Sequence, residues 1–166
     1  MSGTKSTKKR NNDSKTSKKQ ITIVMGVVLN NNRVLMTQRF EEECPDAHLK
    51  WELPDGKIKF GEEPNITIER EIYEETGVKV KAQALIPIVR TCIWNYKIGI
   101  IQHTILLGYF CKFLRQDSQE KKDHHVEKFE WVRISDLHKK DILPGDEDFI
   151  NEARKQVFVE QGSKRE

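Results

Sequence analysis

The residues with the clearest potential for chemistry lie in an acidic segment at positions 56–78, GKIKFGEEPNITIEREIYEETGV. If this segment is helical, Glu71, Glu74 and Glu75 lie within one turn and share a face. Like charges at this spacing destabilise an isolated helix, and the helical part contains a single cation, Arg70. A solvated charged face would intersperse lysines among the glutamates. Because Mg²⁺ requires several convergent carboxylates, the segment predicts a divalent-metal site.

The elements that must position this site can be predicted from local signals. Pro64 suits the first turn of a helix and Gly77 the left-handed position after its end, so we expect a helix over 64–76. Its core-facing residues are expected to be Ile66 and Ile72, with Ile68 or Tyr73. β-branched and apolar runs predict strands at 21–30, 34–40, 51–54, 78–90, 98–114 and 128–134, the first two joined as a hairpin. A short helical turn capped by Ser135 and a terminal amphipathic helix over 146–161 follow.

Length and composition limit the classes of function. A chain of 166 residues, of which 36% are hydrophobic, suits one soluble domain with a real core. The interspersed strands and helices predict an α+β fold with a mixed sheet between helices. No apolar run is long enough to span a bilayer, the N-terminus has no signal-peptide core, and the three cysteines show no metal-type spacing. We therefore expect a cytoplasmic protein with no membrane partner.

Residues 1–19 form a basic tail, with seven Lys or Arg residues and one acidic residue. Its Lys-, Ser-, Thr- and Asn-rich composition predicts disorder. The rest of the chain carries 22 basic and 25 acidic side chains, so its net charge is slightly negative although the whole chain is slightly positive. The tail is either a solubilising extension or, around residues 8–10, a nucleic-acid contact or nuclear targeting signal. We expect one domain over 20–161 and a C-terminal tail at 162–166.

The acidic segment resembles the signature of the Nudix hydrolases, G-x5-E-x7-R-E-U-x-E-E-x-G-U, in which U is an aliphatic residue. Every fixed position of that signature is met, at Gly56, Glu62, Arg70, Glu71, Ile72, Glu74, Glu75, Gly77 and Val78. The resemblance extends over roughly residues 21–160. The stretch NNRVLMTQRF, followed by KWELPDGKIKFGE, is similar to the MutT-type members of the family, which hydrolyse nucleoside triphosphates.

This resemblance implies a Nudix-type α/β/α sandwich with a mixed sheet and a loop–helix–loop metal site. The family cleaves a nucleoside diphosphate linked to another moiety, by attack of water on phosphorus. On this chain Glu71, Glu74 and Glu75 would hold Mg²⁺ or Mn²⁺, and one glutamate could also act as the base. Arg70 would orient a glutamate, and Glu62 would complete that arrangement or contact the metal through water.

The residues just before the helix and those near Trp131 differ from the usual pattern of the family. Gly56 would shape the loop on the substrate side, whose backbone carbonyl reaches the cation. The family commonly has two glycines here, whereas this chain has Asp55 before Gly56. Asp55 either adds a carboxylate to the metal site or distorts the loop, because a strained torsion tolerates Asp less well than Gly.

Members of the family often have a further glutamate five or six residues before a Trp, and no acidic residue stands at that spacing before Trp131. Glu127 is therefore the first candidate for the extra ligand or base, and Glu120 the second.

Markers of the substrate lie outside the signature. Arg39 matches a phosphate- or base-contacting arginine of MutT-type members, with a surface charge as its alternative. Asp146 aligns with the residue that reads the base, with a helix N-cap as its alternative. Tyr96 is a weaker marker of diadenosine polyphosphate hydrolases.

We therefore expect Mg²⁺-dependent hydrolysis of a nucleoside triphosphate or related nucleotide to nucleoside monophosphate and pyrophosphate. Oxidised-nucleotide sanitation is one form of this activity. The alternatives are diadenosine polyphosphate hydrolysis and a catalytically silent binding module. Apart from the basic tail we expect no nucleic-acid partner, and the resemblance leaves a homodimer open.

Overall fold

A computed structural model describes residues 16–117 and 124–162. Its strands are β1 (Ser17–Asn30), β2 (Arg33–Arg39), β3 (Trp51–Glu52), β4 (Asp55–Lys57), β5 (Val78–Tyr96), β6 (Ile100–Gln116) and β7 (Val126–Arg133). The helices are α1 (Pro64–Thr76), the short 3₁₀ helix η1 (Ile134–Lys139) and α2 (Asp146–Gly162). Within the described residues no helix is both long and apolar enough to cross a membrane.

The strands form a mixed sheet, as the sequence predicted. Its main path runs β3-β2-β1-β6-β5, with β4 paired to β1 and β7 paired to β2. Strand β1 is parallel to β6 and antiparallel to β2 and β4, and β5 and β6 form a long antiparallel hairpin. The β1–β2 hairpin turns at Asn31 and Asn32, whose φ angles of 48° and 58° suit the tight turns that match strand twist.

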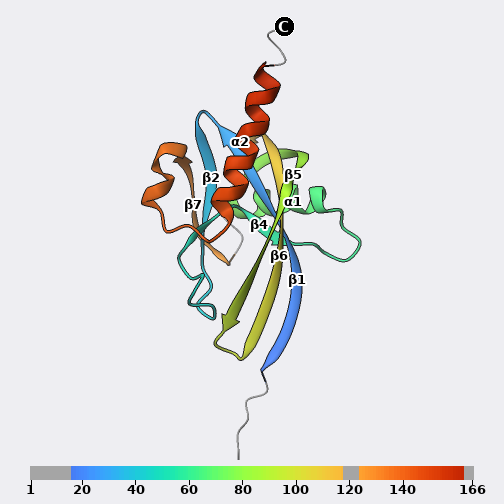
Figure 1. The fold of residues 1–166 in the computed structure, drawn as a ribbon, viewed down its shortest axis with the longest axis vertical. Helices are drawn as coiled ribbons and strands as arrows, with labels where there is room; N and C mark the ends of the chain where they lie inside the picture. Colours follow the sequence, from blue (N-terminus) through green and yellow to red (C-terminus); the bar gives the residue numbers. More distant parts are fainter. Residues whose placement is uncertain (1–15, 118–123, 163–166) are drawn as a thin grey trace, which may run out of the picture.

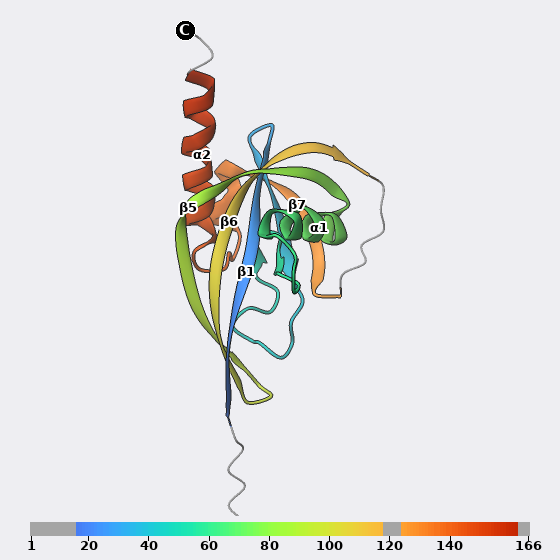
Figure 2. The same ribbon diagram turned by 90° about the vertical axis from the view of Figure 1, so that its right-hand side faces the viewer.

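Helices α1 and α2 lie on opposite sides of the sheet (Figures 1 and 2). The alternation of side chains along β1 produces this arrangement, since neighbouring residues point to opposite faces. Val24 and Val28 pack with the α1 side of the core, whereas Met25 and Val27 pack with the α2 side, around Phe149. The resulting helix–sheet–helix layering confirms the predicted α+β fold.

Helix α1 begins and ends as its terminal residues predicted. Pro64 occupies the first turn, and Gly77 adopts the left-handed conformation with φ of 70°, donating its N–H to the carbonyl of Tyr73. The prediction for its buried face was partly wrong. Ile68 and Ile72 are fully buried, but Ile66 is 46% exposed. Ile68 and Ile72 are four residues apart and therefore lie on the same side of the helix, whereas Ile66 does not lie on that side.

Two further expectations were wrong. Ser17 and the two following lysines lie in β1 and pair with Ile100–Gln102, so the ordered sheet reaches into the segment expected to be disordered. The pairing with β6 supplies backbone hydrogen bonds that composition alone cannot reveal. Ser135 does not cap a helix, because η1 starts at Ile134, with Arg133 at the cap position and no side-chain cap. The rest of the predicted tail, residues 1–15, lies outside the described residues.

Candidate active site

Glu71 and Glu75 project from α1 into a cavity beside β4. They are one helical turn apart, so they share a face, and Glu75 is buried at 6% exposure. Gly56 of β4 makes room for this arrangement. A Cβ atom at Gly56 would overlap the Glu71 carboxyl group, so only glycine lets that carboxylate lie directly against the β4 backbone.

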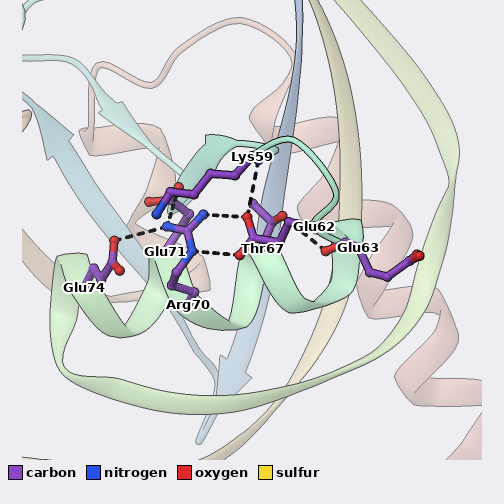
Figure 3. A network of polar contacts seen from close by, with 7 residues as sticks. All are labelled: Lys59, Glu62, Glu63, Thr67, Arg70, Glu71 and Glu74. Carbon is purple, nitrogen blue, oxygen red and sulfur yellow. Dashed lines mark hydrogen bonds and ion pairs between the residues drawn. The ribbon is translucent and has the colours of Figure 1, made fainter.

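Arg70 fixes the orientation of the neighbouring carboxylates (Figure 3). Its Nε and Nη2 donate to the two oxygens of Glu62 at 2.8 and 2.9 Å. Its Nη1 lies 2.8 Å from Glu71 Oε1 and 3.1 Å from Glu74 Oε2. The hydrogen bonds from Arg70 lower the pKa of Glu62 to about 2. The guanidinium thus ties the loop before α1 to Glu71, a geometry that suits the positioning role expected for Arg70.

Glu74 lies differently from Glu71 and Glu75. Its side chain is 45% exposed, pairs with Arg70 and is not part of the cavity wall. In the described part of the chain, no group of three or more His, Cys, Asp and Glu side chains is already arranged to hold a metal ion. The structure therefore brings two of the three predicted ligands, Glu71 and Glu75, to the cavity and leaves Glu74 at its margin.

The cavity, of about 210 Å³, is strongly acidic. The carboxylate residues that line it are Glu41, Glu52, Asp55, Glu71, Glu75 and Asp146. The lysine and arginine residues in its wall are Lys57 and Arg39. Such an excess of carboxylates would repel a polyphosphate unless cations were bound between them. The donor set is also the one that Mg²⁺ and Mn²⁺ prefer, so the residues fit a divalent cation.

Arg39 is held between two carboxylates inside this cavity. Its Nε donates to Glu52 Oε2 at 2.8 Å, and its Nη2 to Asp55 Oδ2 at 3.0 Å. Burial raises the pKa of Glu52, and the charge of Arg39 opposes that rise. The sequence analysis missed Glu52, although a glutamate between Trp51 and Leu53 in a buried strand was a usable signal.

The structure bears on the two alternatives left open for Asp55. Its φ is not positive, so the backbone at this position does not require glycine. Strand β4 pairs regularly with β1, with Asp55 opposite Met25. The Asp55 side chain lines the cavity. The loop is therefore not distorted at Asp55, and the added carboxylate lies in the cavity wall, where it pairs with Arg39.

Asp146, the first residue of α2, also lines the cavity. It is 2% exposed, and its Oδ2 accepts the backbone N–H of Leu53 at 2.6 Å. Burial raises the pKa of Asp146 to about 8, against the opposing hydrogen bond from Leu53. The Asp146 carboxyl group therefore reaches across to the segment after β3 and lies in the cavity wall.

The remaining wall is largely apolar and comes from the sheet. Trp94 and Tyr96 of β5 line it, so the candidate Tyr96 lies in the cavity. Gln102 and Thr104 of β6 also line it, and the sequence analysis missed both, although they interrupt an apolar run at a spacing of two. Glu127 is exposed on β7 and is not part of the cavity wall, whereas its neighbour Val126 is. Glu120 lies outside the described residues.

The family model described as NUDIX domain matches residues 19–153, most of the chain. The chain belongs to the Nudix hydrolase family. It is therefore a pyrophosphohydrolase that acts on acid anhydrides, as the resemblance in its acidic segment implied.

Several proteins that are similar to this chain in sequence or structure are named as hydrolases or phosphatases. This Nudix hydrolase is 30% identical over 128 residues to the putative 8-oxo-dGTP diphosphatase 2 of Mycobacterium tuberculosis, a match that covers 77% of this chain and 84% of that protein. It is 26% identical over 127 residues to the RNA pyrophosphohydrolase of Blochmanniella pennsylvanica, which covers 66% and 76% of the two chains. The structure of a Nudix hydrolase from Nitrosomonas europaea superposes with a TM-score of 0.68 at 18% identity, over 83% of this chain and 90% of that one. This structural likeness confirms the fold.

Proposed function

We propose that this Nudix hydrolase cleaves nucleoside triphosphates to a nucleoside monophosphate and pyrophosphate, with Mg²⁺ or Mn²⁺ bound at Glu71 and Glu75. One observation carries the proposal: a single cavity is lined both by metal-type carboxylates and by the buried Asp146 with aromatic side chains. A phosphate chain and a base need these two environments at the same time. The M. tuberculosis relative, named an 8-oxo-dGTP diphosphatase, supports this substrate class.

The residues divide the work according to their positions. A divalent cation, when bound, neutralises phosphate charge and makes a water nucleophilic at neutral pH. Glu71, oriented by Arg70, and Glu75 are the carboxylates placed to hold that cation, with Asp55 nearby in the same wall. Either glutamate can accept the proton of the attacking water. Arg39 supplies the partly buried positive charge that can meet a phosphate, and the protonated Asp146 can donate a hydrogen bond to the base or accept one from it.

The test is a substrate panel assayed with Mg²⁺. It should contain the dNTPs, 8-oxo-dGTP, diadenosine polyphosphates, ADP-ribose and a 5′-triphosphate RNA, with separate detection of pyrophosphate and phosphate. We expect a nucleoside triphosphate to be the best substrate and pyrophosphate to be the product. A preference for a diadenosine polyphosphate or for RNA would reassign the substrate, and no turnover of any member would overturn the proposal.

A pair of variants links the turnover to the site. Glu75→Gln should lower kcat by about a hundredfold or more, because it removes a charge expected to hold the cation. Glu63→Gln, on an exposed residue just before α1 whose side chain makes no cap hydrogen bond, is the matched control and should retain activity. Equal activity in the two variants would contradict the assignment of the metal site.

A further inference from the structure

Two buried polar side chains, Gln102 and Thr104, interrupt the apolar part of the cavity wall. Alternate residues of β6 face the cavity, and among them Gln102 is 5% exposed and Thr104 is 2% exposed. Their antiparallel partners on β5 are Trp94 and Cys92, which also line the cavity. The pair therefore belongs to the surface against which a bound molecule would lie.

The Gln102 side chain is only half satisfied. Its Nε2 donates to Thr104 Oγ1 at 3.0 Å. Its Oε1 is buried and has no hydrogen-bond partner in the described part of the chain. A buried acceptor left in this state costs free energy, which a donor on a bound ligand would recover.

The surroundings define what could meet this oxygen. Trp94, the strand partner of Gln102, and Tyr96 contribute aromatic side chains to the cavity wall, as suits a nucleobase. Asp146, in the same cavity, is protonated below about pH 8, so it adds an O–H donor and keeps a carbonyl oxygen as a further acceptor. Two acceptors in one site favour a base with several donors. Guanine presents N1–H and an exocyclic 2-amino group, whereas adenine presents a single amino group on its pairing edge.

We propose that Gln102 Oε1 accepts a hydrogen bond from the 2-amino group of a guanine-type base, so that Gln102 determines base preference. The inference rests on the proposed function, because it concerns recognition of the base in the same cavity. Thr104 acts as a positioning residue that holds the amide through its hydroxyl.

The test compares dGTP with dITP, whose base differs from guanine only by lacking the 2-amino group. Wild-type enzyme should show a kcat/KM about tenfold higher for dGTP, with the difference mainly in KM. Gln102→Met, which keeps the length but replaces the amide oxygen by a thioether that accepts only weakly, should lower kcat/KM for dGTP about tenfold and change that for dITP by less than about threefold. Gln102→Leu provides a second variant, and thermal unfolding identifies those that are folded.

His103→Ala is the matched control, because His103 lies between Gln102 and Thr104 on the opposite face of β6 and outside the cavity wall. It should keep the wild-type preference for dGTP. Equal losses for dGTP and dITP in a folded Gln102 variant would overturn the inference, as would a wild-type enzyme without preference between them.

A binding measurement separates this inference from the proposed function. Calorimetric affinities of dGMP and dIMP need no turnover, and dGMP should bind wild-type protein about tenfold more tightly, a difference that Gln102→Met should abolish. If no triphosphate is hydrolysed but this binding difference is found, the proposed function fails while the role of Gln102 stands. If triphosphates are hydrolysed and the two monophosphates bind equally, the role of Gln102 fails alone.

Discussion

Replacing Asp146 by Asn should change how the stability of the protein depends on pH. Asp146 is 2% exposed, and burial raises its pKa from the ordinary value of 3.8 to about 8 in the folded state. Asn keeps a side-chain oxygen that can accept the N–H of Leu53 but has no proton to lose. The variant therefore removes the titration and retains the hydrogen bond.

The sign of the effect follows from where the proton is bound. Between pH 4 and pH 8 the unfolded chain has lost the Asp146 proton while the folded protein keeps it. The folded state binds more protons in this window, so the free energy of unfolding falls as pH rises. The contribution is fully present below pH 3.8 and is lost once the pH passes about 8. Its slope is about 1.4 kcal/mol per pH unit, or about 3 kcal/mol between pH 5 and pH 7.

The assay is urea unfolding of wild-type and Asp146→Asn protein at pH 5, 6 and 7. Burial raises the pKa of Glu52 as well, so the wild-type profile alone does not isolate Asp146. The difference between the two proteins does, and wild type should lose about 3 kcal/mol relative to the variant over this range. Asp148→Asn, on an exposed residue of the same helix, controls for removal of a carboxylate. Parallel profiles for wild type and Asp146→Asn, or an equal divergence in the control, would refute the reasoning.

Two further predictions concern the carboxylates of α1. Gly56→Ala should lower kcat at least about tenfold and destabilise the fold by about 1–3 kcal/mol, because the new Cβ displaces the Glu71 carboxyl group. Activity assays measure the first effect and urea unfolding measures the second. Unchanged activity would contradict the close packing of Glu71 against Gly56. Arg70→Lys should weaken Mg²⁺ binding, measured by calorimetry, about ten- to a hundredfold, because lysine lacks the fork that holds Glu62 and Glu71 together. Arg115→Lys, on a largely exposed residue, should bind Mg²⁺ as wild type does, and equal affinity in both variants would count against the role of Arg70.

Local signals predicted much of the fold because the forces behind them act within a few residues. Pro64 and Gly77 set the limits of α1 through their own backbone preferences, and the β-branched run at 21–30 predicted the strand that became β1. The errors arose where the partner was distant. Ser17 joins the sheet through β6, and Ile66 is exposed because the sheet covers another side of α1.

The sequence by itself determined the family and the acidic helix, since nine residues at fixed spacing within one short segment suffice for both. Only the tertiary structure decided which of these residues face the cavity and which groups share it. It places Glu74 outside the cavity wall, and it brings Glu52 and Gln102 to the cavity that holds Asp146. Glu52, Gln102 and Asp146 come from β3, β6 and the start of α2, and their proximity depends on strand pairing and helix packing. Such long-range contacts leave no spacing pattern in one sequence, whereas a helical metal site does.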